Sequence, residues 1–103
     1  MRDAIDALWT TIKSRIGADT SKSYTAQLLA AGTPRIAKKL GEEGVELAIA
    51  AALNDRTAAV GESADLLYHW LVLMAAMGIE PDEVFAELAR RKNLSGLEEK
   101  RGR

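Results

Sequence analysis

The sequence predicts an all-α protein, an antiparallel bundle of four to five helices that is completed by dimerisation. In each long segment, apolar residues recur at three- and four-residue spacing, as on one face of a helix. Capping and breaking residues separate these segments, and none has the alternating pattern of a half-buried strand. The run from Leu66 to Met77 is almost wholly apolar. In a chain of 103 residues this indicates that a partner chain covers part of it.

The first half of the chain contains the start and stop signals of three helices. The first helix is expected from about Asp3 to Ile16, with one apolar stripe and Gly17 after its end. After a polar turn, a short helix from Thr25 to Ala31 stops at Gly32. Thr33-Pro34 then predicts the start of a long helix, as a capping residue followed by proline at the first helical position.

The second half continues the same pattern. The long helix should run to about Leu53, where Asn54-Asp55 ends it and begins a second long helix from about Arg56 to Met77. Pro81 opens a last helix, whose first turn is acidic and whose last turn is basic, as the helix dipole favours. We therefore expect a single domain over residues 1–93 and a charged, mobile tail over residues 94–103.

Composition excludes several classes of protein. The formal net charge of −1 gives no overall attraction to nucleic acid or to an anionic membrane, so neither is expected as a partner. The absence of cysteine excludes disulfides and thiolate zinc sites, and a single histidine excludes a multi-histidine metal site within one chain. The longest apolar run is shorter than the roughly 20 residues that span a bilayer. The N-terminus lacks a signal-peptide pattern, and we expect a cytoplasmic protein.

Two pairs of acids are the most informative feature of the sequence. Glu43 and Glu46 are three residues apart on the first long helix, and so lie on the same side of it, one turn apart. Glu62 and Asp65 have the same spacing on the second. The short link at Asn54-Asp55 makes the two helices antiparallel neighbours. Each pair lies about 8 to 11 residues from this link, so the pairs should face each other at one depth in the hairpin.

Four carboxylates this close repel one another unless a cation neutralises them. A set of oxygen ligands favours a hard divalent ion, magnesium or alternatively manganese, over zinc. Magnesium held in this way keeps water positions open, which suits phosphate chemistry. The competing interpretation is a set of surface ion pairs along one helix, such as Lys39 with Glu43. The matched depth of the pairs favours the metal site.

Several residues near the acids are candidates for binding a substrate. Lys39 shares a helix side with Glu43 and is placed to contact a metal-bound phosphate. Lys38 points about 100° away and is expected to be solvated. His69 lies on the same side of the second long helix as Glu62 and Asp65. It is either a substrate contact or a hydrogen-bonded core residue.

A polar segment before the short helix adds further candidates. Lys22, Tyr24 and Thr25 could hold a phosphate or a ribose of a nucleotide substrate. Equally, Ser23 or Thr25 could serve only as the N-cap of the short helix. No glycine-rich phosphate loop is present, so a nucleotide would be held largely through its phosphates and metal.

Two runs carry a family resemblance: KKLGEEGVE over residues 38–46 and ESADLLYH over residues 62–69. They resemble the phosphoribosyl-ATP pyrophosphatase family, the second enzyme of histidine biosynthesis. That family belongs to the MazG-like all-α NTP pyrophosphatases, which share an ExxE motif, a spacer and an ExxD motif. SYTA at 23–26, GTPRIA at 32–37 and SGL at 95–97 are also similar. One departure is Gln27, where relatives often carry a basic residue.

The resemblance implies roles for individual residues. The magnesium ligands it implies are Glu43, Glu46, Glu62 and Asp65. Glu42 would be a further ligand or, with Glu43, a catalytic residue that orients the attacking water. Lys39, and less directly Lys38, would contact the phosphates. The implied reaction is hydrolysis of 1-(5-phosphoribosyl)-ATP to the AMP derivative and pyrophosphate by a homodimer.

Two other functions compete with this one. A MazG-like housecleaning pyrophosphatase would use the same carboxylates on non-standard or deoxynucleoside triphosphates. A helical dimerisation module would use its acids only structurally, and would release no pyrophosphate from any nucleotide. The segment from Lys22 to Thr25 distinguishes the two enzymes, because the carboxylate core is common to both.

Overall fold

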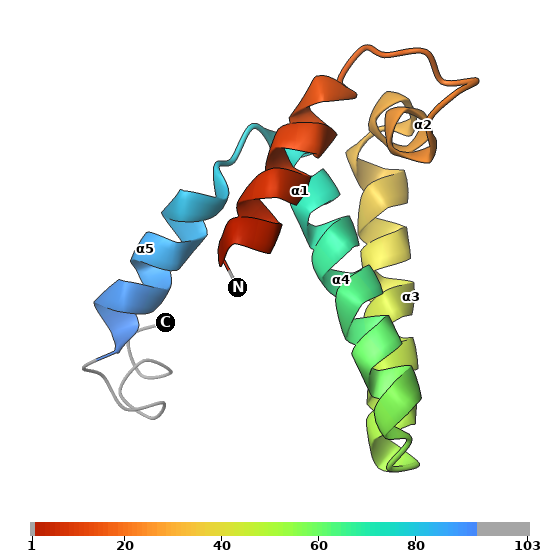
Figure 1. Ribbon diagram of the computed structural model, residues 1–103, viewed down its shortest axis with the longest axis vertical. Helices are drawn as coiled ribbons and strands as arrows, with labels where there is room; N and C mark the ends of the chain where they lie inside the picture. Colours follow the sequence, from red (N-terminus) through yellow and green to blue (C-terminus); the bar gives the residue numbers. More distant parts are fainter. Residues whose placement is uncertain (1, 93–103) are drawn as a thin grey trace.

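The computed structural model describes residues 2–92 and contains, within that range, five α-helices and no strand (Figure 1). The helices are α1 (Arg2–Ser14), α2 (Tyr24–Ala31), α3 (Thr33–Ala52), α4 (Arg56–Met77) and α5 (Pro81–Arg91). The all-α prediction is therefore confirmed for this part of the chain. The predicted tail at 94–103, which includes the SGL segment, lies outside the described residues.

The centre of the fold is a hairpin of the two long helices, α3 and α4, which lie side by side and antiparallel (Figure 1). Its turn is short because Asn54 takes a left-handed conformation, with φ of 55°, that asparagine tolerates better than most residues. The Asp55 side chain then accepts a hydrogen bond from the Ala58 backbone N–H at 3.0 Å and caps α4. The hairpin that the Asn54-Asp55 link predicted is thus present.

The buried core lies at the end of the hairpin away from this turn, where α1 and α2 pack on α3 and α4. Its innermost side chains come from all four helices: Ile12, Leu28, Ile36, Leu71 and Val72. Burying one such aliphatic side chain contributes about 1.5–3 kcal/mol. These contacts hold α1 and α2 on one end of the hairpin and leave the other end uncovered.

The apolar run from Leu66 to Met77 is covered unevenly. Leu71, Val72 and Met74 are buried by the chain itself, whereas Leu67 is 49% exposed and Met77 is 54% exposed. The centre of the run therefore needs no partner chain. Across residues 2–92, no helix has both the length and the hydropathy needed to cross a membrane.

The helices α1 and α5 form an arm that diverges from the hairpin, so the chain is an open V and not a closed bundle (Figure 1). Trp9 of α1 donates an indole hydrogen bond to Glu80 at 3.1 Å, and Lys13 pairs with the same carboxylate at 3.6 Å. The rings of Trp70 and Phe85 lie 6.2 Å apart and join α4 to α5. The radius of gyration is 15.5 Å, against about 13 Å for a compact domain of 100 residues.

The end of the first helix differs from the prediction. The helix α1 ends at Ser14, whereas the apolar stripe predicted an end near Ile16. The N–H groups of Arg15 and Ile16 bond to carbonyls three residues back, at 3.0 and 3.3 Å, so the chain tightens into a turn. Ile16 is 57% exposed, and extending the helix would bury nothing there.

The starts of α2 and α3 also correct the sequence interpretation. Ser23 is the cap of α2, accepting a hydrogen bond from the Ala26 N–H at 3.1 Å, so α2 begins at Tyr24. Thr33, predicted as a capping residue, is the first residue of α3, and Gly32 takes the cap position. Gly32 has φ of 96° and ψ of 169°, a conformation that is essentially restricted to glycine. This one residue ends α2 and redirects the chain into α3.

Candidate metal centre

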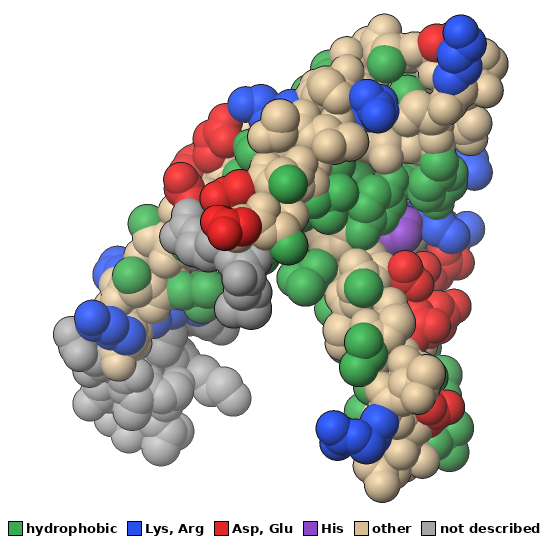
Figure 2. Space-filling view, in the orientation of Figure 1, with side chains coloured by type: hydrophobic (Ala, Val, Ile, Leu, Met, Phe, Trp, Pro, Cys, Tyr) green, Lys and Arg blue, Asp and Glu red, His purple; other side chains and the backbone are tan. Residues whose placement is uncertain are grey.

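Three carboxylates from facing sides of α3 and α4 converge beside the hairpin. Glu43 of α3 and Glu62 and Asp65 of α4 each offer one oxygen, and these oxygens lie within 4.8 Å of one another. Glu43 and Glu62 are half-buried, and Asp65 is exposed. Figure 2 shows acidic side chains on this side of the hairpin, next to the histidine and to basic side chains nearer α2. The hairpin therefore brings together three of the four acids in the predicted pairs.

The fourth acid, Glu46, lies outside the three-oxygen group but affects the pKa of Glu62, which belongs to it. Hydrogen bonding to the Glu43 carboxylate, then to that of Glu46, favours the protonated form of Glu62 and raises its pKa to about 7. Burial and the negative charges of Glu46 and Glu43 add to this effect. Two ionised carboxylates have no donor between them, so such a bond exists only while one of them carries a proton.

Two of the residues in this cluster have a buried carboxylate oxygen without a hydrogen-bond partner. Oε2 of Glu43 and Oε2 of Glu62 are buried, and no donor from residues 2–92 reaches either atom. Buried acceptors without donors are costly to a folded protein. A hard divalent cation bound here would satisfy both oxygens and take the place of the proton that the raised pKa of Glu62 retains. The donor set, carboxylate oxygen throughout, fits magnesium or manganese.

The basic candidates on α3 are placed differently from one another. Lys39 is half-buried, and its Nζ lies 3.7 Å from a carboxylate oxygen of Glu42. Glu42 is exposed and lies outside the three-oxygen group, although Glu43 is its neighbour. Lys38 is exposed. Of the two lysines on α3, Lys39 is therefore the one that contacts an acidic side chain.

His69 connects the carboxylates to α2. It is 5% exposed, and its Nδ1 lies 2.8 Å from the Asp65 backbone carbonyl. A carbonyl only accepts, so Nδ1 is the donor and the neutral ring has its free lone pair on Nε2. Nε2 is buried and has no partner among residues 2–92. The ring packs edge-on against Tyr68 and Tyr24, with centroids 5.0 and 6.5 Å away.

The hydroxyl of Tyr68 makes a polar contact that the sequence did not predict. It forms a hydrogen bond with the Thr25 hydroxyl of α2. Burial of Tyr68 raises the pKa of its phenol above the usual value. Spacing in the sequence places Tyr68 on the same side of α4 as Asp65, three residues earlier, but its contact with Thr25 depends on how α2 packs on α4.

Comparison with known proteins identifies the chain that carries this centre. Residues 5–92 match the family model described as phosphoribosyl-ATP pyrophosphohydrolase. The chain belongs to this family. Relatives named phosphoribosyl-ATP pyrophosphatase occur in Parvibaculum lavamentivorans (58% identical over 99 residues) and Paramagnetospirillum magneticum (54% over 99 residues). Each match covers 96% of this chain and 91% of the relative. Another, from Rhizorhabdus wittichii, is 52% identical over 103 residues, covering 100% of this chain and 97% of the relative.

The match to the phosphoribosyl-ATP pyrophosphohydrolase family confirms the resemblance inferred from the acidic motifs and their flanking segments. It spans every candidate site residue, from Lys22 to His69. Within the structure, however, Lys22 is exposed in the loop between α1 and α2, where its backbone N–H bonds to the Asp19 carbonyl at 3.1 Å. No side-chain contact with the carboxylates is present for it within residues 2–92.

Proposed function

We propose that this chain hydrolyses 1-(5-phosphoribosyl)-ATP to 1-(5-phosphoribosyl)-AMP and pyrophosphate, a step of histidine biosynthesis, with magnesium as its cofactor. The observation that carries the proposal is the carboxylate cluster across the hairpin, in a member of the phosphoribosyl-ATP pyrophosphohydrolase family. Two of its buried oxygens lack any donor within residues 2–92, which supports a cation as their partner.

The metal ligands in this proposal are the half-buried Glu43 and Glu62, with Asp65 and Glu46 on the exposed side. When bound, magnesium would neutralise the phosphate oxygens and lower the pKa of a coordinated water. Manganese can replace it, since the ligands are all oxygen atoms. Glu46 enters because its carboxylate is close enough to influence Glu62.

The remaining roles fall to residues beside the cluster. Lys39 supplies a cation one turn before Glu43, where it holds the phosphate chain of the substrate. Glu42, which lies outside the three-oxygen group, orients the attacking water. The Nε2 lone pair of His69 accepts a hydrogen bond from the substrate, aided by the adjoining Tyr24 and Thr25.

A substrate panel tests the proposal. Purified protein with magnesium is given phosphoribosyl-ATP, ATP, dUTP and dCTP at equal concentration, and released pyrophosphate is measured with and without EDTA. We expect phosphoribosyl-ATP to be strongly preferred and EDTA to abolish release. A preference for dUTP or dCTP would instead identify a housecleaning pyrophosphatase. No release from any nucleotide would leave the helical dimerisation module as the better description.

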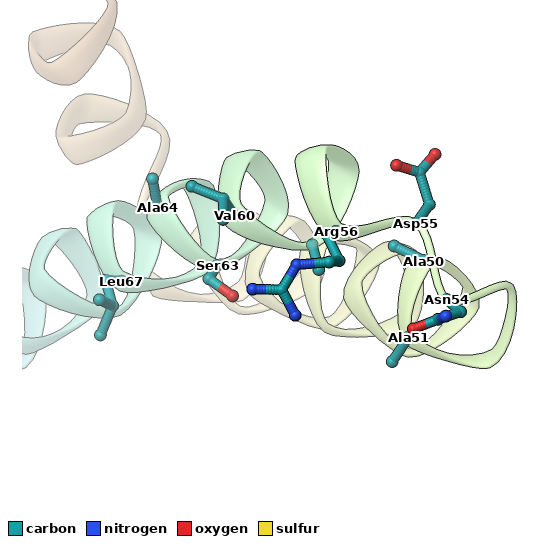
Figure 3. Close-up of a pocket in the computed structure, with 10 residues that line it drawn as sticks. Ala50, Ala51, Asn54, Asp55, Arg56, Val60, Ser63, Ala64 and Leu67 are labelled. Carbon is teal, nitrogen blue, oxygen red and sulfur yellow. The ribbon is translucent and has the colours of Figure 1, made fainter.

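We further propose that the protein is a homodimer formed through the uncovered end of the hairpin. Val45, Ile49 and Leu53 form a stripe along α3 at four-residue spacing and are 60%, 54% and 74% exposed. Val60 of α4 is 72% exposed and lines a groove of about 650 Å³ beside the turn, together with Leu67 (Figure 3). Four-residue ridges of this kind pack into the grooves of a second helix pair.

The second copy is the occupant that suits this surface best. The same stripe is present on every copy, so a two-fold axis would bring two such surfaces together. The open V leaves the hairpin end accessible to it (Figure 1). We propose that residues 1–93 act as one domain in each copy. We also propose that the dimer works in the cytoplasm, because a chain without cysteine needs no oxidising compartment to form disulfides.

A further inference from the structure

A second pocket, of about 410 Å³, lies beside the metal centre between α2 and α3. The residues that line it are Tyr24, Gln27, Leu28, Ala31, Arg35 and Lys39. Leu28 and Ala31 give it an apolar floor, and Tyr24, 51% exposed, gives it an aromatic side. Lys39 and Tyr24 connect it to the centre, since Lys39 pairs with Glu42 and the Tyr24 ring packs against His69. The pocket therefore adjoins Glu42 and His69, which flank the carboxylates of the candidate metal centre.

The charge of this pocket is positive. Arg35 and Lys39 line it and no acid does. Within residues 2–92 no carboxylate pairs with Arg35, and the single contact of Lys39, with Glu42, is a half-exposed pair of the weak kind. The Gln27 amide is already used, donating to the Thr20 carbonyl at 2.9 Å. Arg35 is therefore the cation in the pocket with its donors available to a ligand.

The position of Arg35 is locally unfavourable for a cation. It is the third residue of α3, and the positive end of the helix dipole lies in that first turn. The positive end of the same dipole attracts an anion, and the Arg35 guanidinium adds to this attraction. Arg35 therefore does not stabilise the start of α3, which leaves its guanidinium available for a role in binding an anion.

The distance from the carboxylates decides which anion this is. Arg35 precedes Glu43 by eight residues on α3, which is about 12 Å at 1.5 Å per residue. Lys39 lies between them, four residues before Glu43, so the phosphates held at the carboxylates lie nearer to Lys39 than to Arg35. Arg35 lines the same pocket one turn farther from the acids, where a second anionic group of the substrate would be bound.

We infer that this pocket binds the 5-phosphate of the substrate's phosphoribosyl group through Arg35, and so selects phosphoribosyl-ATP over ordinary nucleoside triphosphates. The inference rests on the proposed function. Among the nucleotides of the substrate panel, phosphoribosyl-ATP carries a phosphate monoester in addition to its triphosphate, whereas ATP, dUTP and dCTP do not. The guanidinium offers the planar pair of donors that suits a terminal phosphate. Arg35 is then a specificity residue, and the carboxylates act alike on any triphosphate.

The test pairs one variant with one substrate analogue. Arg35→Gln is assayed with phosphoribosyl-ATP and with ribosyl-ATP, which lacks the 5-phosphate. We expect the variant to lower kcat/KM for phosphoribosyl-ATP about 10- to 100-fold, the value of charge-assisted hydrogen bonds to one phosphate. The parent protein should lose a similar factor on ribosyl-ATP. The variant should lose nothing further on that analogue, since the contact is already gone.

Two control variants separate recognition from folding. Arg35→Lys keeps the charge and should recover part of the loss. Lys92→Gln, at an exposed position just after α5, removes an equal charge and should leave activity unchanged. The melting temperature of Arg35→Gln should equal or exceed that of the parent, because the cation opposes the helix dipole. Equal losses on both substrates, or unchanged activity of Arg35→Gln on phosphoribosyl-ATP, would overturn the inference alone. A parent without preference for phosphoribosyl-ATP would overturn the proposed function and the inference together.

Discussion

Glu62 is a half-buried carboxyl group whose pKa depends on two neighbouring acids, Glu43 and Glu46. Folding places it against Glu43 and Glu46, and its pKa rises from 4.5 to about 7. Between these values the folded protein holds a proton that the unfolded chain has released. A metal ion competes directly with that proton, since both neutralise the same oxygens.

The stability of the metal-free protein should therefore fall as the pH rises. The contribution of Glu62 is fully present below pH 4.5 and is lost as the pH passes through about 7. Thermal unfolding in EDTA across this range should show the decline, and magnesium should reverse it near pH 7. Glu62→Gln, which has no proton to lose, should flatten the pH dependence. An unchanged slope in that variant would assign the decline to other groups.

Glu46→Gln tests whether the acid outside the three-oxygen group is nonetheless a metal ligand. Its side chain is exposed, so the variant should fold normally. We expect hydrolysis of phosphoribosyl-ATP to fall at least about 100-fold, since metal coordination contributes several kcal/mol to such reactions. Asp6→Asn, an exposed acid on α1, is the charge-matched control. Activity near the parent level in Glu46→Gln would remove Glu46 from the ligand set.

Among the elements, the connection between α2 and α3 depends most on one residue. Gly32→Ala should destabilise the protein by about 1–3 kcal/mol, because φ of 96° and ψ of 169° strain any side chain. The space around the new methyl is not limiting, as its nearest neighbour is the Pro34 Cδ at 3.9 Å. Chemical denaturation measures the change.

A second glycine gives the opposite expectation and so serves as the control. Gly41 lies within α3, and a Cβ there would meet nothing within 4 Å. Gly41→Ala should stabilise the protein by up to about 1 kcal/mol through helix propensity alone. If both variants lost stability equally, backbone conformation at Gly32 would not be the cause.

The ends of a helix could be predicted from the sequence where a capping or helix-breaking residue acts within its own turn. Asp55 and Pro81 fixed the starts of α4 and α5, because each acts within its own turn. Periodicity misjudged the end of α1, since it cannot tell that Ile16 has no element to pack against. The pairing of Glu43 with Glu62 followed from hairpin depth. The proximity of Arg35 to Tyr24 depends on how α2 crosses α3, which no local pattern encodes.

At the scale of the whole molecule, the open V leaves the apolar stripe of α3 in solvent. Ile49→Glu places a charge at the centre of that stripe, where burial against a second copy would be costly. We expect the variant to be a monomer at micromolar concentration while the parent is a dimer, as measured by light scattering after size exclusion. Leu88→Glu, on the exposed part of α5, is the control for added charge. A parent that is itself monomeric would refute the dimer.

The turn of the hairpin also limits how such a protein can change in length over evolution. Each residue inserted between Glu43 and Glu62 in one arm would rotate the acids beyond it by about 100° and displace them by about 1.5 Å. Only insertions matched in both arms, of about seven residues each, would restore both the facing and the depth of the carboxylates. Indels in this segment should therefore occur as compensated pairs, while the loop between α1 and α2 is free to vary one residue at a time.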